Sequence, residues 1–159
     1  MTKQTILRIG KLDDLLELQQ LFVDTVSTIC RADYNDEQIK AWISGIEDTE
    51  RWQGILTQQY VLIAEDKQRI VGFGSLDKGN YIDMLYVHKD RQNQRIAYQI
   101  YNEIEKEAKR QKQTFLTSDV SLTAKSFFEK MGFNTISQQT IIKQGIELIN
   151  FKMTKVLTM

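Results

Sequence analysis

Proline is absent from this 159-residue sequence, and cysteine and histidine occur once each, as Cys30 and His88. A single cysteine excludes an internal disulfide and a cysteine-based metal cluster. A single histidine excludes a metal site with several histidines, so we expect no metal. Without proline the turns must depend on Gly, Asn and Asp, as in the segment 77–80. Cys30 is expected as a small buried residue.

The sequence also lacks an excess of either charge, because 21 basic and 21 acidic residues cancel. This balance gives no general attraction to nucleic acid or to an anionic membrane, so we expect neither as a partner. No run approaches the roughly 20 apolar residues that cross a bilayer, and residues 1–10 hold no apolar signal segment. We therefore expect a cytoplasmic protein with a single domain, 1–159.

The most informative stretch runs from Tyr81 to Arg110. An apolar strand-like run (81–87) is followed by a polar turn and then by a helix beginning near Ile96. The helical pattern comes from apolar residues spaced three and four apart: Ala97, Ile100, Tyr101, Ile104 and Ala108. The first N–H groups of a helix lack partners and carry a partial positive charge. The stretch therefore predicts an anion site for a phosphate-bearing ligand.

The rest of the chain predicts an α+β fold on one mixed, mostly antiparallel sheet. Strands are expected at 6–9, 60–65, 70–76, 115–118, 133–142 and 146–155, and helices at 12–30, from Asn35 onward, and at 121–131. The segment 47–54 is predicted as a loop with Trp52 exposed or half-buried. Gly72 and Gly74 leave one strand face bare, for a closely packed helix or for a ligand.

Two motifs identify a family resemblance. The residues Gln92, Asn93, Gln94, Arg95, Ile96 and Ala97 follow the hydrophobic strand and are similar to Q/R-x-x-G-x-G/A. The segment SLTAKSFFEKMGF (121–133) is similar to A-x-x-F-Y-x-x-x-G-F. Together they resemble the GNAT superfamily of acetyl-CoA-dependent N-acetyltransferases, over nearly the whole chain and most strongly from Tyr60 to Phe133. The resemblance implies a three-layer fold, a twisted sheet of six to seven strands flanked by about four helices.

The resemblance also implies an enzyme and its site. An acetyl group would pass directly from acetyl-CoA to a primary amine of a small molecule or peptide. Leu85, Tyr86 and Val87 would line the acetyl and pantetheine arm, and Gln92 to Ala97 would hold the pyrophosphate. Phe128 would pack near the thiol end. Members of this family often pair through their sheets, so a homodimer is expected to be possible.

Two positions depart from the family pattern. Arg95 occupies the place of the first motif glycine, where a side chain can obstruct the pyrophosphate. If its backbone keeps an ordinary helical φ, its side chain can point outward or pair with a phosphate. Phe128 occupies the place of a tyrosine that protonates the leaving thiolate. The thiolate would then be protonated by another group or by solvent, or the reaction needs no strong acid. These departures motivate the alternative of a non-catalytic acyl-CoA-binding or regulatory module.

A base is needed to deprotonate the amine, and Asp83 is the leading candidate. It is an acidic residue in an apolar strand, where burial would make it a stronger base; alternatively it faces solvent or bonds to a turn. Glu65 and His88 are weaker candidates. Tyr86 either orients the substrate or fills the core.

The acceptor side is expected near the segment 30–34 and the helix after it. Asp33 would bind a cationic amine, or else it only starts a helix. Tyr34 and Trp42 would wall the acceptor, although Trp42 also suits the core.

Overall fold

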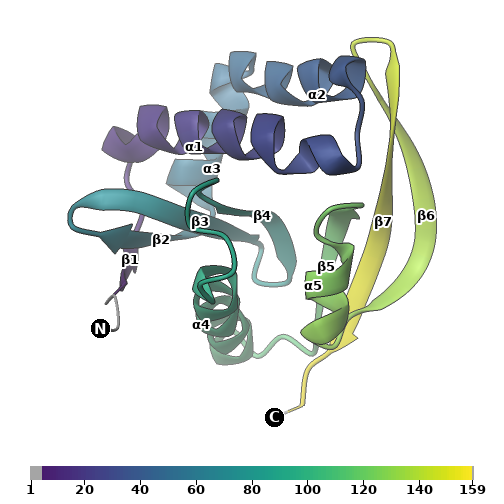
Figure 1. The fold of residues 1–159 in the computed structure, drawn as a ribbon. Helices are drawn as coiled ribbons and strands as arrows, with labels where there is room; N and C mark the ends of the chain where they lie inside the picture. Colours follow the sequence, from purple (N-terminus) through teal and green to yellow (C-terminus); the bar gives the residue numbers. More distant parts are fainter. Residues whose placement is uncertain (1–4, 159) are drawn as a thin grey trace.

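The computed structural model describes residues 5–158, which form three layers (Figure 1). Within these residues a seven-stranded sheet carries five α-helices, with α1–α3 covering one face and α4 and α5 the other. The elements are β1 Ile6–Ile9, α1 Leu15–Thr28, α2 Asp36–Ile43, α3 Thr49–Gln58, β2 Tyr60–Asp66, β3 Arg69–Asp77, β4 Tyr81–Val87, α4 Ile96–Arg110, β5 Phe115–Ser121, α5 Lys125–Lys130, β6 Asn134–Lys143 and β7 Ile146–Val156. Short 3₁₀ turns are η1 Leu12–Asp14, η2 Cys30–Ala32 and η3 Ser44–Glu47.

The strand order is β1-β2-β3-β4-β5-β7-β6. Strands β2, β3 and β4 form an antiparallel meander, whereas β4 and β5 run parallel because α4 connects them. Strands β6 and β7 form the long final hairpin. The α+β class and the mixed, mostly antiparallel sheet predicted from the sequence are confirmed.

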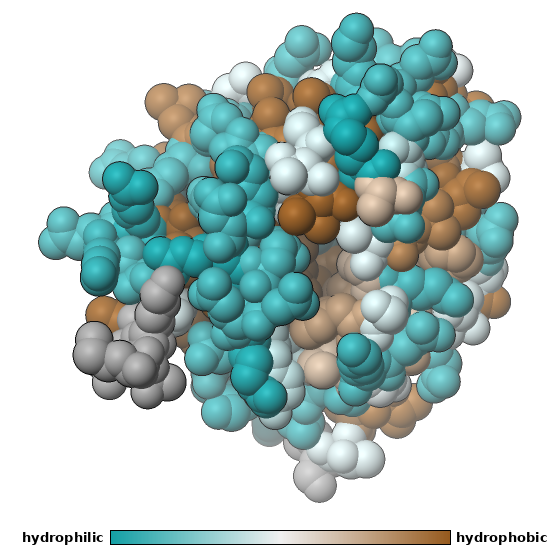
Figure 2. All heavy atoms as spheres, in the orientation of Figure 1, coloured by the Kyte–Doolittle hydropathy of each residue, from teal (hydrophilic) through white to brown (hydrophobic). Residues whose placement is uncertain are grey.

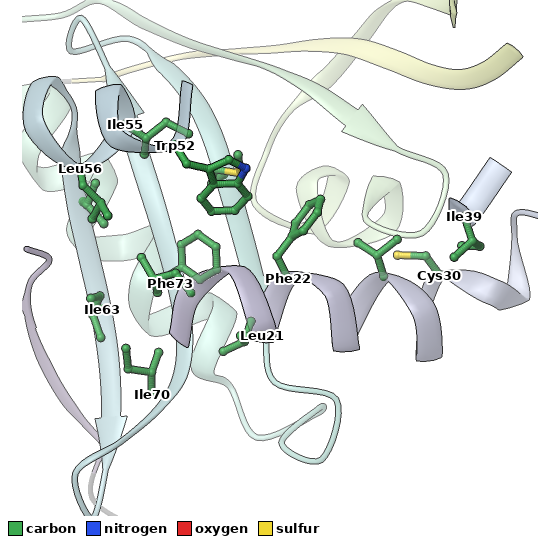
Figure 3. Close-up of a cluster of buried hydrophobic side chains, with 14 of the residues drawn as sticks. Leu21, Phe22, Cys30, Ile39, Trp52, Ile55, Leu56, Ile63, Ile70 and Phe73 are labelled. Carbon is green, nitrogen blue, oxygen red and sulfur yellow. The ribbon is translucent and has the colours of Figure 1, made fainter. Parts of the chain in front are cut away.

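The core above the sheet is built by α1, α2 and α3 (Figure 3). Trp52 of α3 lies over Phe73 of β3 with ring centroids 6.4 Å apart, and the rings of Phe22 of α1 and Trp52 meet edge to face with centroids 5.4 Å apart. Trp52 is only 2% exposed. The predictions of a loop at 47–54 and of an exposed or half-buried Trp52 were therefore wrong. The helix α3 begins in this segment, where Asp48 caps it by accepting a hydrogen bond from the N–H of Arg51 at 3.1 Å.

Below the sheet, α4 lies unusually close to β3. A Cβ atom on Gly74 would come within 2.8 Å of Ile100 Cγ2 and 2.9 Å of Ile104 Cδ1, and one on Gly72 within 2.9 Å of Ile96 Cγ2. Of the two explanations for the bare strand face, close helix packing is correct. This packing fixes where α4 begins relative to the end of β4.

Candidate active site

The strands β4 and β5 begin side by side and then separate. They are paired at Tyr81–Thr117 and Ile82–Ser118, and no later residue of the described β4 pairs with β5. The two strands diverge in Figure 1, and Figure 2 shows a hollow with apolar atoms in the same part of the view. A cleft of about 270 Å³ lies there. A parallel sheet opened in this way presents unpaired backbone groups to a ligand.

Asp83 sits in a bulge at the mouth of this gap. On β3, Leu76 faces Ile82 and Ser75 faces Met84, so Asp83 is the extra residue of β4. A bulge interrupts the alternation of side chains and redirects the bulged residue, and bulges of this kind are common beside active sites. Ile82 consequently packs with α4, whereas Met84 packs with α1–α3.

The carboxylate of Asp83 is held by two residues, one in α3 and one at its C-terminal end. Arg51 of α3 donates two hydrogen bonds to it, at 3.2 Å to Oδ2 and 2.9 Å to Oδ1. Gln59 Nε2 donates a third, at 2.8 Å to Oδ2. The side chain of Asp83 is 9% exposed and that of Arg51 is 47% exposed. Because a carboxylate has about four acceptor sites, Oδ1 keeps capacity for one more donor.

The backbone beyond the bulge turns N–H groups toward the gap. The N–H of His88 donates to the carbonyl of Val71 on β3 at 2.8 Å. Since the N–H groups of a strand point alternately to its two sides, those of Leu85 and Val87 point away from β3. The carbonyl of Val87 also points away, because it accepts a bond from Thr25 Oγ1 at 2.9 Å. Leu85 and Tyr86 line the cleft.

The loop between β4 and α4 is shaped by two left-handed residues, Asn93 with φ 61° and Arg95 with φ 64°. The condition considered for Arg95, an ordinary helical φ, is therefore not met. Arg95 is the N-cap of α4 in the left-handed region, which glycine adopts without a steric penalty. Its guanidinium lies over the ring of Tyr98, 4.6 Å from the centroid, and within residues 5–158 no side chain caps the first N–H groups of α4.

The side chains of the loop are largely used to hold the loop itself. Gln92 Nε2 donates to the carbonyls of Val87 at 2.8 Å and His88 at 3.3 Å. Arg91 forms an ion pair of 2.8 Å with Asp66 at the end of β2. Ile96 is buried, Ala97 is half-buried, and Gln94 is exposed. The loop thus offers backbone N–H groups on a firm support.

Aromatic side chains form much of the cleft wall. Phe128 is buried and packs edge to face on Phe133, at 5.0 Å between centroids, so the position of the family's tyrosine carries a fixed apolar ring. Tyr86 is half-buried against Phe22, at 5.1 Å between centroids, and burial raises the pKa of its phenol. Tyr34 and Trp42 meet edge to face at 5.2 Å between centroids and also line the cleft.

The Tyr34 hydroxyl forms two hydrogen bonds with backbone groups of the protein. It donates to the carbonyl of Ile149 at 2.6 Å and accepts from the N–H of Leu122 at 2.9 Å. It therefore ties the segment after α1 to both β7 and the start of the α5 region. Tyr34 shapes the cleft by position, and its hydroxyl is already occupied.

Other candidates lie away from this cleft in the described part of the chain. Asp33 is exposed and its carboxylate accepts from Thr123 Oγ1 at 2.8 Å. Glu65 on β2 pairs with Arg8 at 3.1 Å, and His88 lines a second cleft beside α1. Cys30 is buried as expected, and burial raises the pKa of its thiol to about 11.

The cleft residues that sequence reasoning missed include Arg51, Tyr81 and Asp119. The Tyr81 hydroxyl donates to Asp119 Oδ2 at 2.8 Å and so links β4 to β5 beside their last paired residues. Only the polar residues of 47–54 and the isolated acid in β5 hinted at them. In the described residues no cluster of His, Cys, Asp or Glu is arranged to bind a metal, and no helix is long and apolar enough to span a membrane.

Comparison with known proteins matches this geometry to one family. The sequence model described as an acetyltransferase (GNAT) domain matches residues 30–155. The chain belongs to the GNAT family. This GNAT protein is similar to the uncharacterized N-acetyltransferase YafP of Escherichia coli (strain K12), with 33% identity over 140 residues and 88% of each chain covered. It is an acyltransferase enzyme of the GNAT N-acetyltransferase type.

Two solved structures show the same GNAT architecture. A GCN5-related N-acetyltransferase from Rhodopseudomonas palustris, also labelled a class-II aminotransferase, superposes with a TM-score of 0.94 at 32% identity, covering 99% of this chain and 98% of the other. The PaiA N-acetyltransferase of Thermoplasma acidophilum, solved in complex with coenzyme A, superposes with a TM-score of 0.81 at 19% identity, covering 97% and 99%. At that identity the second likeness shows the GNAT fold alone.

Proposed function

We propose that this protein transfers the acetyl group of acetyl-CoA directly to a primary amine of a small molecule or peptide. The observation that carries the proposal is the gap where β4 leaves β5, with outward N–H groups at Leu85 and Val87 beside the uncapped start of α4. The coenzyme A complex of the Thermoplasma acidophilum relative supports the choice of cosubstrate.

The coenzyme's pyrophosphate would lie on the loop from Gln92 to Ala97. The first N–H groups of α4 would donate to it, and the helix dipole adds roughly +0.5 charge at that end. Arg95 suits this role because its left-handed backbone exposes the neighbouring N–H groups while its side chain rests on Tyr98. The same arrangement keeps the guanidinium on the outside of the helix.

The acetyl group would lie between β4 and β5, with its carbonyl oxygen near the N–H of Leu85 or Val87. Attack by the amine nitrogen forms the C–N bond and moves the carbonyl electrons onto oxygen. A preorganised N–H stabilises that oxyanion by roughly 2.7–4 kcal/mol. Holding both reactants in place lowers the barrier by at most about 7–11 kcal/mol. Collapse of the intermediate then breaks the C–S bond.

Asp83 and Tyr86 would manage the protons. Oδ1 of Asp83 has an unused acceptor site at which an amine proton can be received, directly or through a water molecule. Burial raises the pKa of Tyr86, so it stays a neutral phenol that can donate a hydrogen bond to the leaving thiolate, which Phe128 cannot. The products are the acetylated amine and the free thiol of coenzyme A.

Thermal unfolding with acetyl-CoA followed by thiol release tests the proposal. A ligand at 100 times its Kd should stabilise the protein by ~2.7 kcal/mol, and thiol should appear with a subset of a panel of amines and peptides. Ala124→Trp, which fills the cleft beside Phe128, should abolish the shift. Ser126→Trp, on the exposed side of α5, should keep it.

Two results would count against the proposal. No stabilisation at millimolar acetyl-CoA would contradict the binding site itself. Stabilisation without thiol release across the whole panel would favour a non-catalytic acyl-CoA-binding module.

A further inference from the structure

The charged side chains that line the cleft cancel one another. Two are acidic, Asp83 and Asp119, and two are basic, Arg51 and Lys143. A cleft that selects a polycation needs an excess of carboxylates, because each ammonium left without a partner in a partly dry site is costly. This cleft has no such excess. Its charges instead suit a ligand that carries one group of each sign.

Arg51 provides the place for an anionic group. Its two hydrogen bonds to Asp83 fix the orientation of the guanidinium and leave its remaining N–H donors unused by that carboxylate. The side chain is 47% exposed and lines the cleft. Planar guanidinium donors match a carboxylate at two points. Lys143, at the end of β6, adds a second cation to the lining.

Asp119 provides the place for an ammonium group. Its donors are both neutral: the Tyr81 hydroxyl at 2.8 Å and Gln139 Nε2 at 2.9 Å. Lys152 lies opposite it on β7, yet no ion pair to Asp119 occurs among residues 5–158. These two donors hold the carboxylate at the mouth of the gap, near the free acceptor site on Asp83 Oδ1.

Building on the proposed function, we infer that the acceptor is a small zwitterion, a primary amine bearing a carboxylate, as in a free amino acid. Its carboxylate binds Arg51, and its ammonium binds Asp119 and Asp83 before the nitrogen turns toward the acetyl carbon. The volume of about 270 Å³ must also admit the acetyl end of the coenzyme, which favours a small acceptor. Polyamines and aminoglycosides lack the matching charge, and aminoglycosides are also too large.

Matched pairs of amines test the inference. Each amino acid is compared with the amine that lacks only its carboxylate, such as leucine with 3-methylbutylamine, and spermidine represents the polycations. The protein is first saturated with coenzyme A, and thermal stabilisation by each amine is measured; kcat/KM with acetyl-CoA is then measured for the same set. At least one amino acid should exceed its partner by about 10-fold or more in apparent affinity, the scale of a charged hydrogen bond.

Variants separate the two anchors. Arg51→Gln should bring the ratio of the two affinities, amino acid over carboxylate-free amine, close to one. Asp119→Asn should lower the affinity for both compounds and leave their ratio unchanged. Arg110→Gln, which removes an arginine paired with Glu107 on α4, is the matched control and should change neither. Coenzyme binding is read separately, so its failure would contradict the proposed function. If coenzyme A binds but spermidine or the carboxylate-free amines are preferred, or no zwitterion stabilises the complex, the inference is overturned.

Discussion

Arg51 of α3 forms a two-point ion pair with Asp83, the extra residue of the bulge in β4. The bulge redirects the Asp83 side chain, and Arg51 of α3 binds its carboxylate. The pair joins the layer of helices above the sheet to the mouth of the gap between β4 and β5. The position of α3 therefore bears directly on the chemistry proposed for the cleft.

Replacing Asp83 with asparagine tests its role with the amine. Asp83→Asn keeps the shape but cannot receive a proton, so kcat should fall by about 10²–10⁴-fold while coenzyme affinity stays the same. Steady-state kinetics across pH and a coenzyme titration check this. Asp36→Asn, which removes an exposed carboxylate paired with Arg31, is the control. An unchanged kcat and pH profile in Asp83→Asn would remove this residue from the mechanism.

Replacing Arg95 tests the strain at the start of α4. A non-glycine residue in the left-handed region costs on the order of 1 kcal/mol, so Arg95→Gly should raise the free energy of unfolding by about 1 kcal/mol. In a chain of this length that corresponds to a rise in Tm of about 2–4 °C. Coenzyme affinity should be kept or improved, as measured by titration.

The control at the same position is Arg95→Ala. It removes the guanidinium over Tyr98 but keeps the left-handed strain, so it should not stabilise the protein. A severalfold loss of coenzyme affinity in both variants, larger at low salt, would show instead that Arg95 is a phosphate ligand.

A pair of glycine substitutions tests how closely α4 is packed. Gly74→Ala would place Cβ 2.8 Å from Ile100 and should destabilise the protein by about 1–3 kcal/mol. Gly54→Ala is the matched control, since no atom lies within 4 Å of a Cβ there and alanine favours the helix by roughly 0.5–1 kcal/mol. Denaturant unfolding of both variants measures the change in the free energy of unfolding, which should fall for Gly74→Ala and rise for Gly54→Ala. Equal effects would contradict the close contact of α4 with β3.

The sequence predicted correctly those segments whose structure is determined by residues close to them in the chain. The strand, turn and helix from Tyr81 to Arg110 depend on neighbours in the chain, and the helix predicted to begin near Ile96 has Ile96 as its first residue. The helix α3 was missed because its polar first turn and Gly54 read as a loop. The stripe of Trp52, Ile55 and Leu56 becomes decisive only once Phe73 is folded beneath it. Burial there outweighs a poor local propensity.

Raising the pH tests the buried tyrosines. Burial raises the pKa of Tyr101, whose hydroxyl donates to Glu105 Oε1 at 2.6 Å. In the unfolded chain a tyrosine ionises near pH 10, so the folded state keeps its proton longer. Its contribution to stability is complete below about pH 10 and is lost above it, by about 1.4 kcal/mol per pH unit.

The measurement is urea unfolding at several pH values on both sides of about 10, where this loss begins. Tyr101→Phe should show a shallower loss of stability with rising pH than the natural sequence, whatever its absolute stability. Identical slopes in the two proteins would mean that Tyr101 ionises alike in the folded and unfolded states.

The site was predictable only in part, for a related reason. Leu85, Tyr86 and Phe128 were placed at the cleft by motifs that are contiguous in sequence. Arg51 was not, because its pairing with Asp83 spans 32 residues and depends on a one-residue bulge. A bulge changes which face of the sheet a side chain occupies, and the alternation of polar and apolar residues along the strand does not predict where a bulge falls.

An amide NMR titration with acetyl-CoA, compared with coenzyme A, tests the central claim most directly. We expect both ligands to change the chemical shifts of the amides in the loop and first turn of α4 (94–97). The chemical shifts of the Leu85 and Val87 amides should change more with acetyl-CoA than with coenzyme A. Shifts that spare both regions, or that are confined to the second cleft beside α1, would contradict it.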